Sequence, residues 1–429
     1  MTDPHIDYDV YAQMSLGEIN ISSREKAHLR ALASTLAQVA AQPKQEQKRN
    51  LWLKHNALEQ TRPLVFCLPE NAWNEILDES ALFCENETAR YFETRLTKEI
   101  LWATEFETDR VAVAQFRVPY IYSRTGWGVK EEIIGQGGNN AYTWNPSIAS
   151  FDDIHKLRAP KIHVDYIATG RLFDAAQDTF GDILQVTKKG LWWWSLGLTM
   201  DLIKFRGLQQ FLIDMYDNPD GIHELMAFIR NAKMEMLDFL EQNNLLSLNN
   251  DRTHLGIGGH GFSNQLPQND FAGVVRTADM WGFSESQETV GVSGEMFAEF
   301  ILPYQIPLAE RFGLNAYGCC EPLDNRIEHV LNGIPNLRKV AVSPWSDLKN
   351  MAARLQDKYI ISYKPNPAML AVDCLDEKEI RRNLKADMKI ARKHNARLEV
   401  FMQDTYTLFG NRENLSKWCR IARQVSMGL

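Results

Sequence analysis

The chain has 429 residues, of which 45% are hydrophobic and 24% charged, and its formal net charge at pH 7 is −8. This length suits a large core or two domains, and the acidic balance argues against a nucleic-acid-binding protein. The six cysteines are scattered without the spacing of a disulfide framework, which indicates reduced thiols and a cytoplasmic protein. We find no apolar run of about 18 residues and no apolar leader after Met1, so we expect neither a membrane span nor a signal peptide.

The first predicted elements are two helices. Ser22 and Glu25 have the spacing of a capping box, so we expect a helix over residues 27–41, and a second helix follows over residues 45–58. Both precede the first predicted strand. We interpret residues 1–60 as an N-terminal helical extension that covers the main domain, residues 61–429. A lid or a dimerisation arm is the alternative, so the chain is compatible with a homodimer.

Eight short apolar segments are predicted as strands, and predicted helices separate most of them. The strands are expected at residues 63–68, 110–116, 182–186, 253–258, 315–319, 337–342, 359–363 and 397–402. Short apolar strands alternating with helices are typical of a parallel sheet that is buried on both faces. The number of strands favours an α/β fold of the closed (β/α)8 TIM-barrel type.

A glycine- and aromatic-rich segment, residues 126–144, interrupts this alternation and contains Gly135-Gln-Gly-Gly138. We expect a loop or a hairpin here. Glycines alone are weak evidence for a phosphate site, and no helical pattern follows that would make this segment a P-loop.

Polar side chains follow most of the predicted strands. Because the carboxyl ends of barrel strands meet at one face, where catalysis takes place, we expect these residues to converge. They are Glu70, His260, Glu285, Cys319, Glu321, Lys364 and Asp404.

The centre of this pattern is Asn315-Ala-Tyr-Gly-Cys-Cys-Glu-Pro322, where a predicted strand gives way to a helix. Adjacent cysteines in a strand can be small buried hydrophobic residues. Glu321, which follows them directly, favours a functional site. His260 lies between two glycines, and its interpretation stays open between a loop residue and a ligand.

Three adjacent tryptophans, Trp192 to Trp194, follow another predicted strand. They cannot all face one core, so we expect at least one of them to line a pocket or a partner surface.

Several motifs together resemble the uroporphyrinogen decarboxylase-like superfamily. They are Pro63 to Glu75, Trp281-Gly-Phe-Ser-Glu-Ser-Gln-Glu288, Tyr317-Gly-Cys-Cys-Glu-Pro322, Lys364-Pro-Asn-Pro367 and Gln403-Asp-Thr405. The closer resemblance is to its branch of roughly 400-residue proteins associated with anaerobic methyl transfer, and it runs from about residue 50 to the C-terminus. The resemblance implies a (β/α)8 barrel.

The chain departs from two patterns of this superfamily. The decarboxylases carry an arginine-rich signature after the first strand, whereas this chain has Glu70 and Glu75 there, which would repel a polycarboxylate. Corrinoid-dependent methyltransferases use a His-x-Cys pair and a later Cys to bind zinc. Here Tyr317-Gly-Cys319 stands in place of the pair, and Lys364-Pro-Asn366 in place of the later Cys. The zinc site that the resemblance implies would therefore combine Cys319, Cys320, Glu321 and His260, a mixed ligand set that suits zinc.

The resemblance implies an anaerobic demethylase, a methyltransferase that moves a methyl group from a small substrate, foremost an aryl methyl ether, to the Co(I) corrinoid of a partner protein. An ether oxygen is a poor leaving group and needs an acid or a Lewis acid. The catalytic candidates are Glu285, Glu288, Asp404 and Lys364, and the substrate-binding candidates are Trp73, Glu75, Arg117, Trp193, Trp194, Tyr317 and Asn366.

Two other classes of function stay open. The first is a lyase that decarboxylates a small acid or a porphyrinogen-like substrate, with Lys364 and Arg117 on the carboxylate. The second is a non-catalytic binding or assembly protein, against which the many polar residues expected on one face argue.

Overall fold

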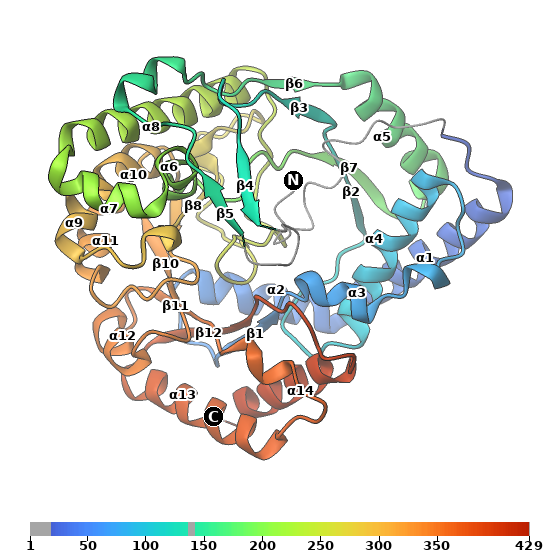
Figure 1. Cartoon of the computed structure of the whole chain (residues 1–429). Helices are drawn as coiled ribbons and strands as arrows, with labels where there is room; N and C mark the ends of the chain where they lie inside the picture. Colours follow the sequence, from blue (N-terminus) through green and yellow to red (C-terminus); the bar gives the residue numbers. More distant parts are fainter. Residues whose placement is uncertain (1–18, 136–141, 429) are drawn as a thin grey trace.

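The computed structural model describes residues 19–135 and 142–428, and it has an α/β fold around a parallel sheet of six strands (Figure 1). Hydrogen bonds join the strands in the order β1-β12-β11-β10-β9-β8. Their bounds are β1 Leu64–Cys67, β8 Trp281–Ser284, β9 Leu314–Tyr317, β10 Leu337–Val342, β11 Ile360–Tyr363 and β12 Arg397–Met402. Since all six run in one direction, the segments that follow them leave the sheet at the same edge.

A second parallel pair, β2 (Gln115–Pro119) with β7 (Gln185–Lys189), lies beside this sheet. Single backbone hydrogen bonds connect the two units: the N–H of Asp109 donates to the carbonyl of Val65 (2.7 Å), and that of Leu196 to Phe283 (2.9 Å). Within the described ranges, no strand ladder joins β1 to β2 or β7 to β8.

Two antiparallel pairs complete the strands: β3 (Tyr122–Arg124) with β6 (Ile162–Val164), and β4 (Glu132–Gly135) with β5 (Tyr142–Asn145). The pairing of β4 with β5 agrees with the hairpin expected within residues 126–144. The residues at the centre of its glycine-rich run, 136–138, lie outside the described residues.

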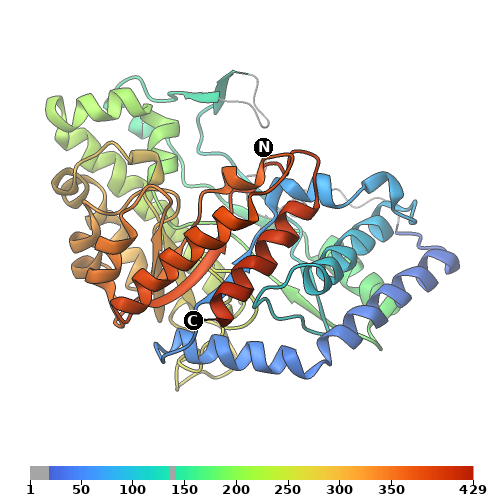
Figure 2. The same ribbon diagram turned by 90° about the horizontal axis from the view of Figure 1, so that it is seen from below.

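Helices surround both sheets (Figure 1), and α13 and α14 lie side by side against β12 and β1 (Figure 2). The α-helices are α1 Ser23–Ala40, α2 Pro43–Asn56, α3 Trp73–Ile76, α4 Glu87–Thr104, α5 Tyr166–Phe180, α6 Thr199–Arg206, α7 Leu208–Asp217, α8 Pro219–Gln242, α9 Gly294–Phe300, α10 Leu302–Ala309, α11 Ile327–Gly333, α12 Leu348–Leu355, α13 Glu377–Lys393 and α14 Glu413–Met427. Short 3-10 helices cover Glu70–Ala72, Glu79–Ala81, Phe151–Lys156, Thr277–Asp279, Gln287–Thr289 and Pro367–Leu370.

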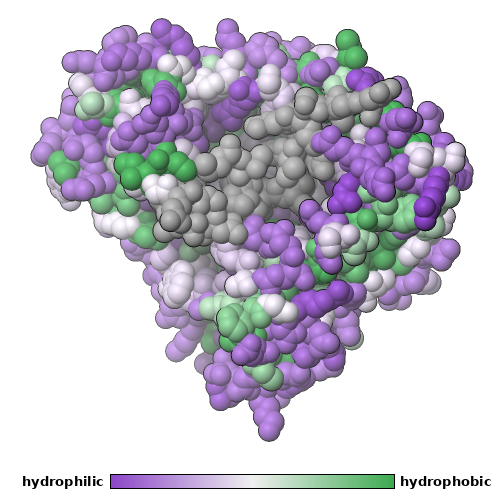
Figure 3. Space-filling model, turned by 45° about the vertical axis from the view of Figure 1, so that its right-hand side comes forward, coloured by the Kyte–Doolittle hydropathy of each residue, from purple (hydrophilic) through white to green (hydrophobic). Residues whose placement is uncertain are grey.

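Figure 3 shows one face on which hydrophilic residues predominate and hydrophobic residues form small separate groups. No helix in the described part of the chain combines the length and the apolar character needed to cross a lipid bilayer.

The predicted N-terminal helices are confirmed. Ser22 caps α1, and its backbone N–H donates to the carboxylate of Glu25 (2.8 Å), which completes the capping box. The apolar face of α1, with Leu29 and Leu36, packs with α4 and α5 in a core of its own. The division at residue 60 stays a prediction, and residues 1–18 lie outside the described part of the chain.

The strand predicted over residues 253–258 is wrong. This segment forms a hairpin in which His254 pairs with His260 in a single antiparallel bridge. A side chain at Gly258 would place its Cβ 1.8 Å from an oxygen of Glu399, and one at Gly259 would place its Cβ 1.9 Å from the ring of Trp52. The hairpin is thus packed so closely inside the fold that only glycine fits at these two positions. The place in the sheet belongs to β8, which we did not predict as a strand.

The interior of the sheet contains a buried ion pair. Lys339 on β10 and Glu399 on β12 are fully buried, with 2.9 Å between ammonium and carboxylate. The imidazole of His55 on α2 lies 3.6 Å from the same carboxylate, and the N–H of Gly259 donates to it (3.1 Å). Burial opposes the charge of Glu399, but Lys339 and His55 outweigh it and hold the pKa of Glu399 below its usual value.

We expect Lys339→Met to lower the free energy of unfolding by about 3–5 kcal/mol, because it leaves the carboxylate of Glu399 buried without its cation. Urea denaturation measures the loss. The double variant Lys339→Met/Glu399→Gln removes the orphaned charge as well and should recover part of the stability. A loss under about 1 kcal/mol in the single variant would show that the pair does not hold the two strands together.

Candidate functional site

A pocket of about 520 Å³ opens at the carboxyl ends of the parallel strands. We call it the thiol pocket, because Cys319 and Cys320, which follow β9, lie in its wall. The segments after β1, β7, β8, β10, β11 and β12 and the hairpin at His254 supply the rest of the wall, which includes Glu70, Trp194, Trp345, Asn366, Gln403 and Asp404. The face that the sequence predicted to carry polar residues therefore contains a cavity.

The two thiols form a polar cluster with their neighbours. The sulfur of Cys319 lies 3.5 Å from that of Cys320 and 3.5 Å from the ammonium of Lys364. Cys320 also reaches the carboxylate of Asp404, which accepts from its sulfur at 2.9 Å. The amide of Gln403 lies 3.7 Å from Cys319.

These contacts determine which groups of the cluster are favoured in their charged forms. The S–H of Cys320 and then the Lys364 ammonium lower the pKa of the Cys319 thiol, and together they outweigh its burial. The same contact with Cys319 raises the pKa of Cys320, which therefore keeps its proton. Burial opposes the charge of Lys364, but the thiols and Asp404 outweigh it and raise its pKa. Cys319 is the group that ionises, and Lys364 balances its charge.

Glu70 and Asp404 face each other across the ends of β1 and β12. Both have left-handed backbone conformations, with φ of 48° and 58°, and such conformations cost about 1–3 kcal/mol each in non-glycine residues. The N–H of Thr405 donates to Glu70 (3.0 Å). Burial and the charge of Asp404 raise the pKa of Glu70 well above its usual value. The pocket wall thus contains a carboxyl group whose protonated form is favoured.

Three other carboxyl groups, those of Glu285, Glu288 and Glu321, lie behind the pocket wall. Ser195 and the backbone N–H of Gln287 donate to Glu285 (3.0 and 2.9 Å), and Thr199 donates to Glu288 (2.6 Å). Burial, and next the charge of Glu288, raise the pKa of Glu285 well above its usual value, and burial raises the pKa of Glu288. These groups do not line the thiol pocket, although Gln287, which lies between them in sequence, does.

Glu321 has a structural role. It accepts hydrogen bonds from the backbone N–H groups of Cys319 (2.8 Å) and Ser286 (2.9 Å), and so joins the segment after β9 to the segment after β8. With both oxygens occupied in this way, Glu321 fixes the position of the thiols.

Aromatic rings give the pocket its apolar walls. Trp194 lies in the wall and packs edge-on against Phe283, with 5.5 Å between ring centroids. Trp345 and Tyr406 lie at the opening and are 70% and 50% exposed. Burial lowers the pKa of His254 to about 4, so this residue contributes a neutral imidazole. A flat, neutral ring would find apolar surfaces here and polar groups at the base.

The residues do not fit the zinc site that the resemblance implies. Cys319, Cys320 and Glu321 are adjacent, but the ammonium of Lys364 faces Cys319 where a cation would bind. His260 lies elsewhere: it accepts the N–H of Val111 (3.0 Å) and packs against Trp52 and Phe66. Among the described residues, no three His, Cys, Asp or Glu side chains are grouped as metal ligands.

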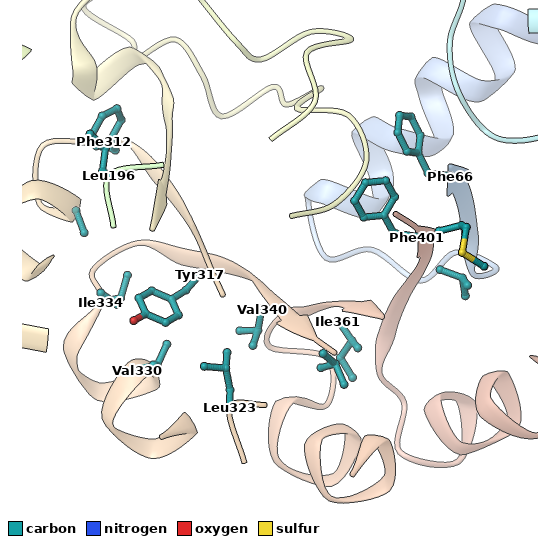
Figure 4. Packing of buried hydrophobic residues seen from close by; sticks show 14 of the residues in the cluster. Phe66, Leu196, Phe312, Tyr317, Leu323, Val330, Ile334, Val340, Ile361 and Phe401 are labelled. Carbon is teal, nitrogen blue, oxygen red and sulfur yellow. The ribbon is translucent and has the colours of Figure 1, made fainter. Parts of the chain in front are cut away.

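Three predicted substrate-binding residues do not reach the pocket: Tyr317 and Trp73 lie in the core, and Glu75 holds a loop in place. Tyr317 is fully buried beside Val330 and Ile334 (Figure 4), and its hydroxyl donates to Gln305 (2.8 Å). Because side chains alternate along β9, Ala316 faces the interior and Tyr317 faces the helices. Cys319 lies beyond the strand, after Gly318 with its φ of 92°, and packs on the side of Ala316. Trp73 packs against Trp102 and Phe106.

Glu75 accepts backbone N–H groups from Leu408 and Gly410 and fixes that loop. Arg117 also lies outside the thiol pocket, where it pairs with Asp251 (2.7 Å). Of the tryptophan run, Trp192 packs against Tyr120 and Tyr122, and Trp193 against Phe312. The structure therefore brings together Cys319, Cys320, Lys364, Asp404, Asn366 and Trp194, with Glu285, Glu288 and Glu321 behind them.

Sequence reasoning assigned no role to several residues of the pocket. Glu70 and Gln403 were recognisable as polar residues at strand ends. His254 was hidden within a segment interpreted as a strand, and Trp345 and Tyr406 are single aromatic residues in loops. The sequence gives no signal that the last three converge.

Comparisons with known proteins bear on the fold. No protein-family model matches the chain, and no curated protein sequence matches it. A solved structure of a methyltransferase from Methanosarcina mazei is similar to it, with a TM-score of 0.50 and 10% sequence identity over 88% of this chain and 98% of that chain. At this identity the similarity shows a shared fold across nearly the whole of both chains.

We expect a thiolate, seen by its absorbance at 240 nm, to titrate below the usual pKa of a cysteine and to disappear in Cys319→Ser. Lys364→Met should move this titration to higher pH, because the cation that stabilises the thiolate is lost. Cys374→Ser changes an exposed cysteine and serves as the control. A titration that stays at the same pH in Lys364→Met would contradict the assignment of Lys364 as the counter-ion.

Proposed function

We propose that this protein is a methyltransferase that takes a methyl group from an aryl methyl ether and transfers it to the Co(I) corrinoid of a partner protein. The observation that carries the proposal is the thiol pocket, whose aromatic walls and protonated carboxyl group suit a neutral ring with a leaving oxygen. The fold shared with a methyltransferase from Methanosarcina mazei supports it. The eight parallel strands in their ladders of six and two are, in this proposal, those of a (β/α)8 barrel.

Glu70 is the acid for the leaving oxygen. The oxygen of an aryl ether leaves as a phenol when a proton reaches it as the carbon–oxygen bond breaks. Glu70 lines the pocket, whereas Glu285 and Glu288 lie behind it. Burial, and next the charge of Asp404, raise the pKa of Glu70 and outweigh the opposing effect of Lys364, which favours the protonated form.

The other polar residues position this acid and the wall around it. The ammonium of Lys364 lies 3.5 Å from the sulfur of Cys319 and favours its thiolate form. Glu285 accepts from Ser195, the residue after Trp194, and so anchors that wall of the pocket. The residues do not fit zinc, and the reaction as proposed has no step through it.

The methyl acceptor approaches from the open end. Co(I) provides both electrons of the new carbon–cobalt bond, and the proton from Glu70 completes the phenol. Trp345 and Tyr406 are large aromatic residues exposed at the opening, and tryptophan and tyrosine are enriched at protein interfaces. They support a partner protein that presents its corrinoid at this end of the pocket.

The alternative hypothesis, a lyase that decarboxylates a small acid, receives less support than methyl transfer. That hypothesis needed Lys364 and Arg117 on one carboxylate. Lys364 contacts Cys319, and Arg117 holds Asp251 outside the thiol pocket.

We expect Glu70→Gln to lower kcat for methyl transfer by at least ~10²-fold, because a glutamine cannot supply the proton. The assay follows the methylation of free cob(I)alamin with a panel of methoxybenzenes and identifies the phenol by mass spectrometry. Wild-type activity should fall as the pH rises through the raised pKa of Glu70, since the protonated form is required.

Glu105→Gln, in an exposed ion pair with Arg412, is the matched control and should keep wild-type activity. Full activity in Glu70→Gln would exclude Glu70 as the acid. Carbon dioxide released from an aromatic acid without any corrinoid would replace methyl transfer with the lyase function.

A further inference from the structure

The adjacent residues Cys319 and Cys320 bring their sulfurs to within 3.5 Å of each other. Neighbouring residues of an extended strand point their side chains to opposite faces, which would separate the two thiols. Here the chain has left β9 at Tyr317, and Gly318 follows with a φ of 92°, a conformation that favours glycine. Glu321 then accepts the N–H of Cys319 (2.8 Å) and fixes this bend. The local backbone therefore places both thiols on the same side of the chain.

Both thiols have polar partners, which distinguishes them from cysteines that serve as small buried hydrophobic residues. The ammonium of Lys364 lies 3.5 Å from the sulfur of Cys319, and the carboxylate of Asp404 accepts from Cys320 at 2.9 Å. A cation beside one thiol favours its thiolate, which is the nucleophilic form. The carboxylate beside the other thiol is a ready acceptor for its proton. The pair thus combines a nucleophilic sulfur with a second thiol that has a base beside it.

Small solutes have access to both sulfurs. Cys319 and Cys320 lie in the wall of the thiol pocket, and Cys320 is partly exposed. Of the other four cysteines, three are buried and Cys374 is exposed. Cys84 lies beside Glu93, and burial, followed by the hydrogen bond to this carboxylate, raises the pKa of Cys84 to about 12. A reagent that attacks thiolates should therefore select Cys319 over Cys84.

We propose that Cys319 and Cys320 form a site of reversible oxidation, at which a hydroperoxide converts the two thiols into a disulfide between adjacent residues. This inference goes beyond the proposed methyl transfer and does not depend on it. The structure supplies the attacking sulfur, the second thiol and the open pocket. The hydroperoxide is the oxidant.

The oxidation takes place in two steps. In the first, the thiolate of Cys319 attacks the terminal oxygen of the hydroperoxide and the oxygen–oxygen bond breaks. The leaving alkoxide takes a proton from solvent, and Cys319 becomes a sulfenic acid. In the second, Asp404 accepts the proton of Cys320, whose sulfur attacks that of Cys319, and the sulfur–oxygen bond breaks. The leaving hydroxide takes this proton and becomes water. The two sulfurs together lose two electrons, which reduce the hydroperoxide to an alcohol and water.

The resulting disulfide is strained and therefore easily reduced. Adjacent Cα atoms are about 3.8 Å apart, whereas disulfides usually join Cα atoms roughly 4.4–6.8 Å apart. Strained disulfides are the labile ones, and they are found at regulatory and catalytic sites. Oxidation also removes the thiolate that faces Lys364, so it changes the charge at the base of the thiol pocket. Reduction by a thiol reverses this change.

The test is peptide mapping of the full-length protein, purified without oxygen and treated with hydrogen peroxide. Trypsin cleaves after Arg311 and Arg326, so both cysteines lie in one peptide, residues 312–326. We expect this peptide to become lighter by two hydrogens and to lose its reactivity towards iodoacetamide, and dithiothreitol should restore both. At pH 7 its oxidation should be at least ~10-fold faster than that of Cys374 in the same sample, because the thiolate is the reacting form. Methyl transfer is not part of this measurement, so a failure of the proposed function would leave its result standing.

Cys320→Ser removes the second thiol and should stop the reaction at the sulfenic acid of Cys319, which dimedone traps. This variant exchanges a single atom of a partly exposed side chain and is therefore safe for folding. Lys364→Met should slow the oxidation of Cys319 by about 10-fold at pH 7, since the thiolate loses its cation. Lys385→Met changes an exposed lysine of α13 and should leave the rate unchanged.

A cysteine pair that stays reduced while Cys374 is oxidised would overturn the proposal. A peptide in which Cys319 carries a sulfinic acid and Cys320 still reacts with iodoacetamide would overturn it too, because the two sulfurs would not have joined. A disulfide between Cys319 and a cysteine outside this peptide would lead to the same conclusion.

Discussion

The buried ion pair of Lys339 and Glu399 fixes the arrangement on which the site depends. Two opposite charges without solvent tolerate little displacement, because separation leaves each of them buried and unpaired. The pair sets β10 against β12, and its contacts reach His55 on α2 and the hairpin at Gly259. Since both residues lie within their strands, the segments that follow the strands start from fixed positions. The segments after β9, β11 and β12 leave the sheet at one edge, where Cys319 contacts Lys364 and Cys320 contacts Asp404.

At the carboxyl ends of the strands, buried charged groups are stabilised in a different way. Here Cys319 contacts the ammonium of Lys364, and Cys320 contacts the carboxylate of Asp404. Burial, and next the charge of Asp404, outweigh the opposing effect of Lys364 and favour the neutral form of Glu70. The surrounding structure keeps the backbone of Glu70 and Asp404 in left-handed conformations. The acid is therefore a consequence of burial and of the charges around it.

The sequence predicts much of this fold for a simple reason. Segments such as residues 337–342 and 397–402 are rich in apolar residues, as strands covered on both faces are, and β10 and β12 have those bounds. The β8 strand was missed because Gly282 and Ser284 weaken the apolar pattern, and residues 253–258 were mistaken for a strand because their apolar residues alternate. Only contact with Glu399 and Trp52, from distant parts of the chain, shows that this segment is a packed hairpin.

The site was predicted less completely than the fold. The cysteine pair with Lys364 and Asp404 followed from positions at strand ends, which the topology brings together. The direction of each side chain did not follow: Tyr317 is two residues from Cys319 but faces α11, and Trp73 lies near Glu70 but packs in the core. The sequence also could not show that the ring of His260 accepts a hydrogen bond from the backbone N–H of Val111. Function at this face is decided by these side-chain directions, which depend on the packing of the whole molecule.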